Sequence, residues 1–233
     1  YVKNIIRTSI FYTKDNLQKA SKPVDKAEWH MTPQTINAYF SPSFNEIVFP
    51  AAILQPPFFN LNADDAVNYG AIGVIISHEM THGFDDQGRN FDKDGNMKEW
   101  WTKEDAERFN KQVQPLVDQF GGFVAIDTMH LNGKLTLGEN IADFGGLTIA
   151  LAAMKDSEEF KANKKIDNYT PLQRFFLSYA QIWRQNIRDE ELMKRVKEDP
   201  HSPGNFRVNG ALPNVPEFYN AFEIKEDDNL YLA

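Results

Sequence analysis

The chain has 233 residues, of which 42% are hydrophobic, and its 33 acidic and 25 basic residues give a net charge of −8. This length and apolar content allow one large domain or two small ones with a real core. The negative charge and the lack of a basic cluster argue against nucleic acid or anionic membranes as partners, and the lack of cysteine excludes disulfides and thiolate metal ligands.

The start of the chain predicts helix without visible chemistry. The chain begins at Tyr1 without a signal peptide, and no apolar run is long enough to span a bilayer. We therefore expect a fragment or mature piece of a longer protein, whose compartment the sequence leaves open. Residues 1–20 carry apolar side chains at loosely helical spacing, followed by Pro23. We predict a helical lead-in over residues 1–28.

A β-hairpin is predicted next. Residues 35–40 alternate in the manner of a strand, and residues 46–49 answer them across a turn at 41–43. If the first strand lies at a sheet edge, its backbone groups can pair with an extended peptide. An ordinary structural hairpin is the alternative, and the residues alone leave both open.

A metal-binding motif follows on a long, buried helix. Residues 51–59 are strongly apolar and are predicted to cross the core irregularly, and Asn62 is predicted to cap the helix. His78 and His82 are four residues apart, so they share a helix face and can bind one tetrahedral Zn²⁺. Glu79 directly follows His78 on the helix, so it is within reach of a water on the open coordination site of the metal. The alternative is a surface helix with two unrelated histidines.

The connection after this helix is predicted to be rich in turns. Asp85 lies one turn past His82 and can accept the other ring N–H of a ligating imidazole. Residues 90–95 (NFDKDG) superficially resemble the start of a calcium-binding loop. The twelfth loop position is Trp101 instead of the required glutamate, so we reject a calcium site there.

The next segment predicts a packing helix. Thr102 is a predicted N-cap, an apolar stripe follows, a kink is expected at Pro115, and Gly121 and Gly122 end the helix. His130 is most simply a structural histidine.

A third metal ligand is predicted in the segment GENIAD, residues 138–143. Glu139 and Asp143 are four apart on an otherwise apolar helix, where two buried carboxylates are costly unless they are paired or bind a metal. That cost is resolved if Glu139 binds zinc and Asp143 hydrogen-bonds a zinc-bound histidine. An exposed acidic helix start is the alternative.

The last third of the chain predicts a charged linker, a helix and a functional loop. Residues 155–168 form the linker, and Thr170 starts a helix whose aromatic stripe includes Trp183. Residues 199–207 hold too many helix breakers for a regular element, and ordered loops often carry site residues. In this loop His201 can donate to an oxyanion, Asp199 can orient His201, and Arg207 can hold a carbonyl or carboxylate, so we expect function here.

Taken together, these segments resemble the neprilysin-type zinc metallopeptidases, a family that includes neprilysin, the endothelin-converting enzymes and bacterial endopeptidase O. The resemblance rests on four separated motifs in the family's order. They are INAYF with NEIVFPAAILQPPFF, then HEMTH, GENIAD and DPHSPGNFRVNG. It covers about residues 29–222. It implies one catalytic domain over residues 1–233 with a thermolysin-like zincin fold, which is α+β but mostly α, with a small sheet over the motif helix.

The resemblance also implies a role for each matching residue. The ligands of one zinc ion per chain would be His78, His82 and Glu139, and the general base would be Glu79. Acids that support the zinc histidines would be Asp85 and Asp143. The tetrahedral intermediate would be stabilised by His201, backed by Asp199. The substrate backbone would be bound by Asn37, Ala38 and Arg207. The apolar pocket after the scissile bond would be lined by Phe58, Val74, Ile75 and Trp183.

We therefore expect a zinc endopeptidase that cleaves oligopeptides and favours a hydrophobic residue after the cut. Family members are much longer and carry a helical region over the site, so this chain corresponds to their C-terminal catalytic part. One alternative is a zinc-bound domain that binds peptides with little turnover because that region is missing. A non-catalytic interaction domain is the other. We expect a monomer, and the absence of cysteine resembles the bacterial branch and favours the cytoplasm over the cell envelope or secretion.

Overall fold

A computed structural model describes residues 1–232, which divide into two compact units at residue 32. The first unit contains helix α1 (Val2–Lys19), none of whose residues is buried. Lys19, in the last turn of α1, forms ion pairs with Asp15 and Glu28. The predicted lead-in is thus a single helix followed by turns. The assignment of both units to one catalytic domain stays a prediction.

The second unit begins with a short antiparallel hairpin. Strand β1 (Tyr39–Ser41) pairs with β2 (Glu46–Val48), with Phe40 opposite Ile47. The prediction of a strand over residues 35–40 was too long at its start. The ladder ends at Val48, two residues before Pro50, which has no N–H to donate. Asn37 and Ala38 therefore lie just outside the ladder.

The helix with the metal-binding motif consists of three consecutive segments. These are α2 (Asp65–Asn68), a π-helical turn (Tyr69–Gly73) and α3 (Val74–Thr81), and a 3₁₀ turn (His82–Phe84) follows. The predicted N-cap Asn62 is wrong: the cap position is Asp64. The Asn62 N–H bonds instead to the side chain of Asn60 within the preceding turn.

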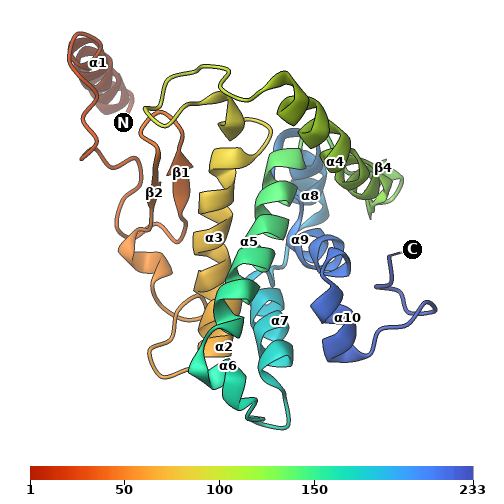
Figure 1. The fold of residues 1–233 in the computed structure, drawn as a ribbon. Coiled ribbons are helices and arrows are strands. Elements are labelled where there is room, and N and C mark those ends of the chain that lie inside the picture. Colours follow the sequence, from red (N-terminus) through yellow and green to blue (C-terminus); the bar gives the residue numbers. More distant parts are fainter. Residues whose placement is uncertain (233) are drawn as a thin grey trace. The chain divides into compact units, whose positions relative to one another are not determined.

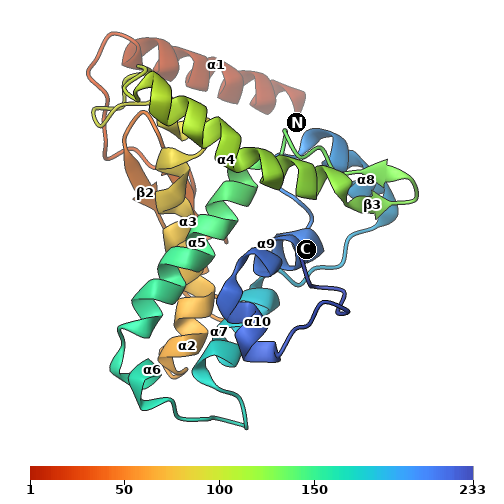
Figure 2. The same cartoon turned by 45° about the vertical axis from the view of Figure 1, so that its right-hand side comes forward.

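Helix α5 (Leu137–Lys155) runs beside α3, as both views show (Figure 1, Figure 2). Helix α7 (Pro171–Ile182) packs on α2 and the π-helical turn, and the β1–β2 hairpin contacts α3. Val74, Leu147 and Phe175 are fully buried where these helices meet. The main core thus lies around α3, α5 and α7.

The remaining described elements surround this core. They are the 3₁₀ turns Ala51–Ile53, Gly88–Asn90 and Leu212–Asn214, the hairpin β3 (Val124–Ile126) and β4 (Met129–His130), and the helices α4 (Lys103–Gly122), α6 (Glu158–Ala162), α8 (Asp189–Glu198), α9 (Gly204–Ala211) and α10 (Pro216–Phe222). The described chain is mostly helical with two short hairpins, which confirms the predicted α-rich class with a small sheet.

Two helix starts confirm their predictions. Thr102 caps α4 by accepting the N–H of Asp105. Thr170 and Gln173 form a capping box at the start of α7, with Pro171 in the first turn.

Two segments predicted as irregular contain helix. Within the charged linker, Ser157 caps α6 by accepting the N–H of Phe160. In the loop at 199–207, the breakers Pro203 and Gly204 lie at the N-cap and first position of α9, so Arg207 belongs to a helix. Proline disrupts a helix interior but is well tolerated at its start.

No helix among residues 1–232 is both long and apolar enough to cross a membrane.

Candidate metal centre

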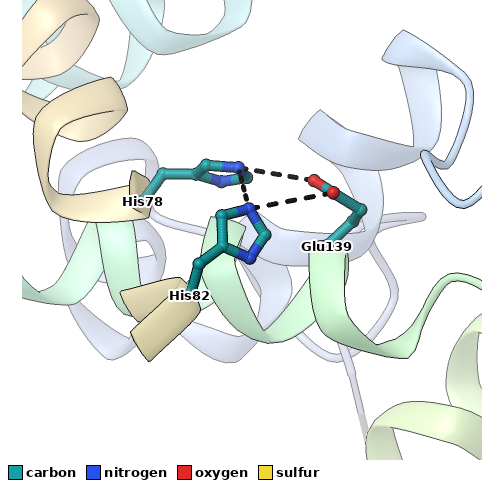
Figure 3. A group of neighbouring side chains, drawn as sticks. All are labelled: His78, His82 and Glu139. Carbon is teal, nitrogen blue, oxygen red and sulfur yellow. Dashed lines mark hydrogen bonds and ion pairs between the residues drawn. The ribbon is translucent and has the colours of Figure 1, made fainter. Parts of the chain in front are cut away.

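Three side chains from two helices converge at the N-terminal end of α5 (Figure 3). His78 lies on α3, His82 begins the following 3₁₀ turn, and Glu139 lies in the first turn of α5. Their ligand atoms all lie within 4.8 Å of one another. The two Nε2 atoms are 3.0 Å apart, and the Glu139 carboxylate oxygens lie 3.4 Å from His78 Nε2 and 3.7 Å from His82 Nε2.

Close contact between two helix backbones brings these residues together. Glu139, Asp143 and Gly146 share one face of α5 because they are spaced by four and three residues. A Cβ atom at Gly146 would lie 2.8 Å from the carbonyl oxygen of Val74 and 3.1 Å from the backbone nitrogen of His78. Only glycine permits this approach, which carries the first turn of α5 to the histidines.

Each histidine has a carboxylate behind it. His82 Nδ1 lies 2.7 Å from Asp85, whose other oxygen accepts the backbone N–H groups of Gln87 and Gly88. His78 Nδ1 lies 3.0 Å from Asp143 Oδ1. If a metal binds the two Nε2 atoms, each imidazole would hold its proton on Nδ1, the atom that faces its carboxylate.

This arrangement fits a zinc ion. Two facing nitrogen lone pairs and the Glu139 carboxylate repel one another unless a cation or proton lies between them. One oxygen of Glu139 is buried and has no hydrogen-bond partner. Two imidazoles and one carboxylate are a donor set that suits zinc with an open fourth position. The residues that would hold the metal are thus the three predicted ligands.

Neighbouring histidine and arginine side chains keep the carboxylates of Glu139 and Asp143 ionised in the metal-free chain. Burial raises the pKa of Glu139, but the contact with His78 and the charges of His201 and Arg207 outweigh burial and hold this pKa at about 2. Burial likewise raises the pKa of Asp143, and Arg207 and His78 outweigh it, so this pKa is also about 2. Both carboxylates therefore carry full charge near pH 7.

Burial and charge shift two further groups on α3. Burial lowers the pKa of His78, but its contacts with Asp143 and Glu139 outweigh burial and raise that pKa to about 9. Glu79 is only 5% exposed, and burial raises the pKa of its carboxyl above the ordinary value. Glu79 is thus a carboxylate that holds a proton more readily than an exposed one.

His201 approaches the same centre from the loop before α9. Its Nε2 lies 3.3 Å from Glu139, and its Nδ1 lies 2.8 Å from Asp199, which also accepts the backbone N–H of His201. The side chain of His201 is 49% exposed. The structure thus brings His201, with Asp199 beside it, to the centre.

Arg207 connects the centre to a small cavity. Its guanidinium forms two hydrogen bonds with Asp143, at 2.7 and 2.6 Å, and stacks on the Trp183 ring at 3.7 Å. These two residues line a cavity of about 310 Å³ together with Asn37, Asp199 and His201. Four residues predicted to bind or act on substrate therefore share one cavity with Asp199, which was predicted to support His201.

The other residues predicted to bind substrate lie elsewhere. Ala38, Val74 and Ile75 are buried in the main core, and Phe58 packs against it. None of these four residues lines the 310 Å³ cavity. The binding of the substrate backbone by Ala38 stays a prediction, and so does the specificity pocket of Phe58, Val74 and Ile75.

Sequence reasoning missed two buried polar residues beside the centre, Asn140 and Ser202. Their side chains hydrogen-bond each other at 2.9 Å. Their positions carried a signal, because each directly follows a predicted site residue, Glu139 or His201.

Comparisons with known proteins match this geometry. The model of Peptidase family M13 matches residues 37–233. Neprilysin-3 of Drosophila melanogaster and human neprilysin are each 45% identical over 97% of this chain, which covers 29% and 31% of those proteins. The neutral endopeptidase of Lactococcus lactis is 43% identical over 95% of this chain, which covers 34% of that protein.

A solved structure extends the match to three dimensions. The structure of Mycobacterium tuberculosis zinc metalloprotease ZMP1 with an inhibitor superposes with a TM-score of 0.89 at 48% identity, covering 94% of this chain and 34% of that one. This match confirms the predicted zincin fold class. The chain spans about a third of the length of the relatives it matches. The described centre, the family match and the shared fold agree that this chain belongs to Peptidase family M13.

Proposed function

We propose that this chain is the zinc-binding catalytic part of a metalloendopeptidase that hydrolyses peptide bonds of oligopeptides. The observation that carries the proposal is the convergence of His78, His82 and Glu139, with the buried Glu79 beside them. A purely structural zinc site would need a fourth protein ligand and no buried glutamate next to it. The membership in Peptidase family M13 supports the same conclusion.

The proposed chemistry divides between the metal and this chain's own residues. His78, His82 and Glu139 would hold a zinc ion, which would supply Lewis-acid chemistry to a peptide carbonyl and a water molecule. Glu79 accepts a proton from the attacking water and passes it to the leaving amine. The raised pKa of Glu79 suits both steps, because the group must gain a proton and then release it.

His201 would stabilise the charge that develops on the carbonyl oxygen. Its Nδ1 faces Asp199, so Nε2 is the ring atom that faces the centre. Removing one such donor typically lowers the rate by about 10²–10³-fold. Arg207 is held by Asp143 and lines the cavity, where its remaining N–H groups can bind a substrate carbonyl.

We propose that the substrate lies extended along the segment before β1. Asn37 and Ala38 lie outside the hairpin ladder, and Asn37 lines the cavity with Trp183. Backbone pairing there would hold a peptide regardless of its sequence. The apolar surface of Trp183 and Ile182 in that cavity supports a preference for a hydrophobic residue after the cut.

A second candidate function is peptide binding with little turnover. The chain spans about a third of its relatives, and the His201 side chain is half exposed. A more open site excludes water poorly, and water weakens the electrostatic stabilisation on which the proposed chemistry depends.

Metal content and peptide cleavage, measured on the same sample, test these proposals. We expect one zinc per chain and cleavage of a quenched fluorescent oligopeptide that a zinc chelator abolishes. Zinc without cleavage would favour the binding-only function. A folded, zinc-supplemented chain that binds no zinc would contradict both. We also propose that the chain is a monomer, and light scattering on the same sample tests this.

The Glu79→Gln variant tests the general base. We expect zinc to be retained and hydrolysis to fall by about 10²–10⁴-fold, because the amide keeps the shape of the side chain but cannot accept the proton. The matched control is Glu107→Gln on the exposed face of α4, whose activity should equal that of the parent. Unchanged hydrolysis in Glu79→Gln would contradict the proposed mechanism.

A further inference from the structure

A buried chain of hydrogen bonds lies directly behind the metal centre. The Ser202 hydroxyl donates to Asn140 Oδ1 at 2.9 Å, and Asn140 Nδ2 donates to the Thr136 hydroxyl at 2.9 Å. Each of these three residues is at most 3% exposed. Since the amide nitrogen is bound on one side, the amide oxygen is fixed toward Ser202.

This series of hydrogen bonds connects the two segments that carry Glu139 and His201. Asn140 directly follows Glu139 on α5, and Ser202 directly follows His201 in the loop before α9. The same two backbone segments therefore make two contacts, one inside the centre between Glu139 and His201 and one behind it.

The rear contact is the buried one. The His201 side chain is 49% exposed, and the side chains of its partners Glu139 and Asp199 are 15% and 32% exposed. Solvent-exposed contacts between charged side chains hold a geometry weakly. Ser202 also lines the 310 Å³ cavity, but it is only 3% exposed, so its hydrogen bond is largely shielded from competing water.

We propose that Asn140 and Ser202 are positioning residues that hold His201 over the metal centre. The inference rests on the proposed function, in which His201 stabilises a developing negative charge. A donor displaced by a fraction of an ångström loses part of its effect, because misplacement by about 1 Å costs about 10²-fold in rate. Loss of the Ser202 hydroxyl alone should therefore cost less than loss of His201.

The Ser202→Ala variant of the zinc-loaded chain tests this role. We expect kcat to fall about tenfold while KM changes less than about twofold, since the hydroxyl acts on the transition state only through His201. The control is Ser178→Ala, which removes another buried hydroxyl, bonded to the carbonyl of Val67 at 2.7 Å. Its kinetics should match the parent's. If Ser202→Ala behaves like Ser178→Ala, the proposal is wrong.

The His201→Ala background separates positioning from general loosening. There, Ser202→Ala should lower the remaining kcat no further, because its target is already gone. An additional tenfold loss in that background would show that Ser202 acts by another route. If Ser202→Ala folds poorly, Ser202→Cys retains the shape with a weaker hydrogen bond and should give an intermediate kcat.

Histidine-ring NMR tests the positioning without turnover. In the zinc-loaded chain we expect the His201 ring to gain mobility in Ser202→Ala but not in Ser178→Ala, with the ring signal assigned by its loss in His201→Ala. An unchanged ring would overturn the inference even if the peptidase is active. A mobile ring in a chain that never cleaves peptide would support the positioning while the proposed function fails.

Discussion

Asp143 is the buried carboxylate that contacts both Arg207 and His78. It is 1% exposed, binds Arg207 through two hydrogen bonds, and faces Nδ1 of His78. One carboxylate thus orients a metal ligand and neutralises a buried guanidinium. A buried pair of this kind contributes modest net stability, but the loss of one partner leaves the other charge uncompensated.

We predict that Asp143→Asn destabilises the zinc-free chain by about 3–5 kcal/mol, because Arg207 stays buried and loses its hydrogen-bonded counter-charge, with Glu139 left at 3.7 Å. Urea unfolding followed by circular dichroism measures this loss. The control is Asp94→Asn, whose exposed ion pair with Lys93 should contribute less than about 1 kcal/mol. Equal unfolding midpoints in the two variants would show that Asp143 does not stabilise Arg207.

At the scale of elements, the contact between α3 and α5 decides whether the ligands converge. Glu139 and Gly146 are seven residues apart on one face of α5, so the helix transmits a displacement at Gly146 to the ligand. The close approach at Gly146 is to backbone atoms of Val74 and His78, which cannot rotate away as a side chain can.

We predict that Gly146→Ala weakens both folding and zinc binding. Alanine favours the helix by up to about 1 kcal/mol, but forcing a methyl group against the α3 backbone costs about 1–3 kcal/mol. Zinc affinity, measured by competition with a chromogenic chelator, should fall as Glu139 moves away from the histidines. The control is Gly121→Ala in α4, where nothing lies within 4 Å of the new methyl group. An equal zinc affinity in both variants would refute the role of this contact.

The elements also show what the sequence could predict and why. The spacing of His78, His82 and of Glu139, Asp143 predicted the ligand faces, because helix periodicity is local. The same local reasoning placed the caps Thr102 and Thr170 correctly. It failed at Asn62, where a turn hydrogen bond competes with capping, and in the loop before α9, where Pro203 begins a helix instead of ending one.

Such local reasoning could not predict which residues far apart in the sequence contact each other. Arg207 was expected to bind substrate, and its pairing with Asp143, 64 residues away, was not anticipated. The bond between Ser202 and Asn140 spans 62 residues. Neither pair has a spacing signature, because tertiary packing alone determines which helix faces meet.

For the whole molecule, α5 joins the metal centre to the far side of the core. Its first turn carries Glu139, and its last residue, Lys155, forms an ion pair with Glu217 on α10. The two ends of one helix thus carry a metal ligand and a pH-sensitive contact. Stability and metal binding should therefore respond separately to changes at the Lys155 end.

We predict that Glu217→Gln lowers stability at pH 7 by about 0.2–1 kcal/mol and leaves zinc affinity unchanged. The hydrogen bond with Lys155 holds the pKa of Glu217 below its ordinary value of 4.5. A carboxyl whose pKa is lowered by folding stabilises the protein above its ordinary pKa, and that stabilisation disappears as the pH falls through the lowered value. The difference between parent and variant should therefore be constant near pH 7 and shrink below 4.5. Urea unfolding across this range measures it, with the exposed Glu226→Gln as control. A difference that persists undiminished at low pH would show that the glutamine acts through packing instead of charge.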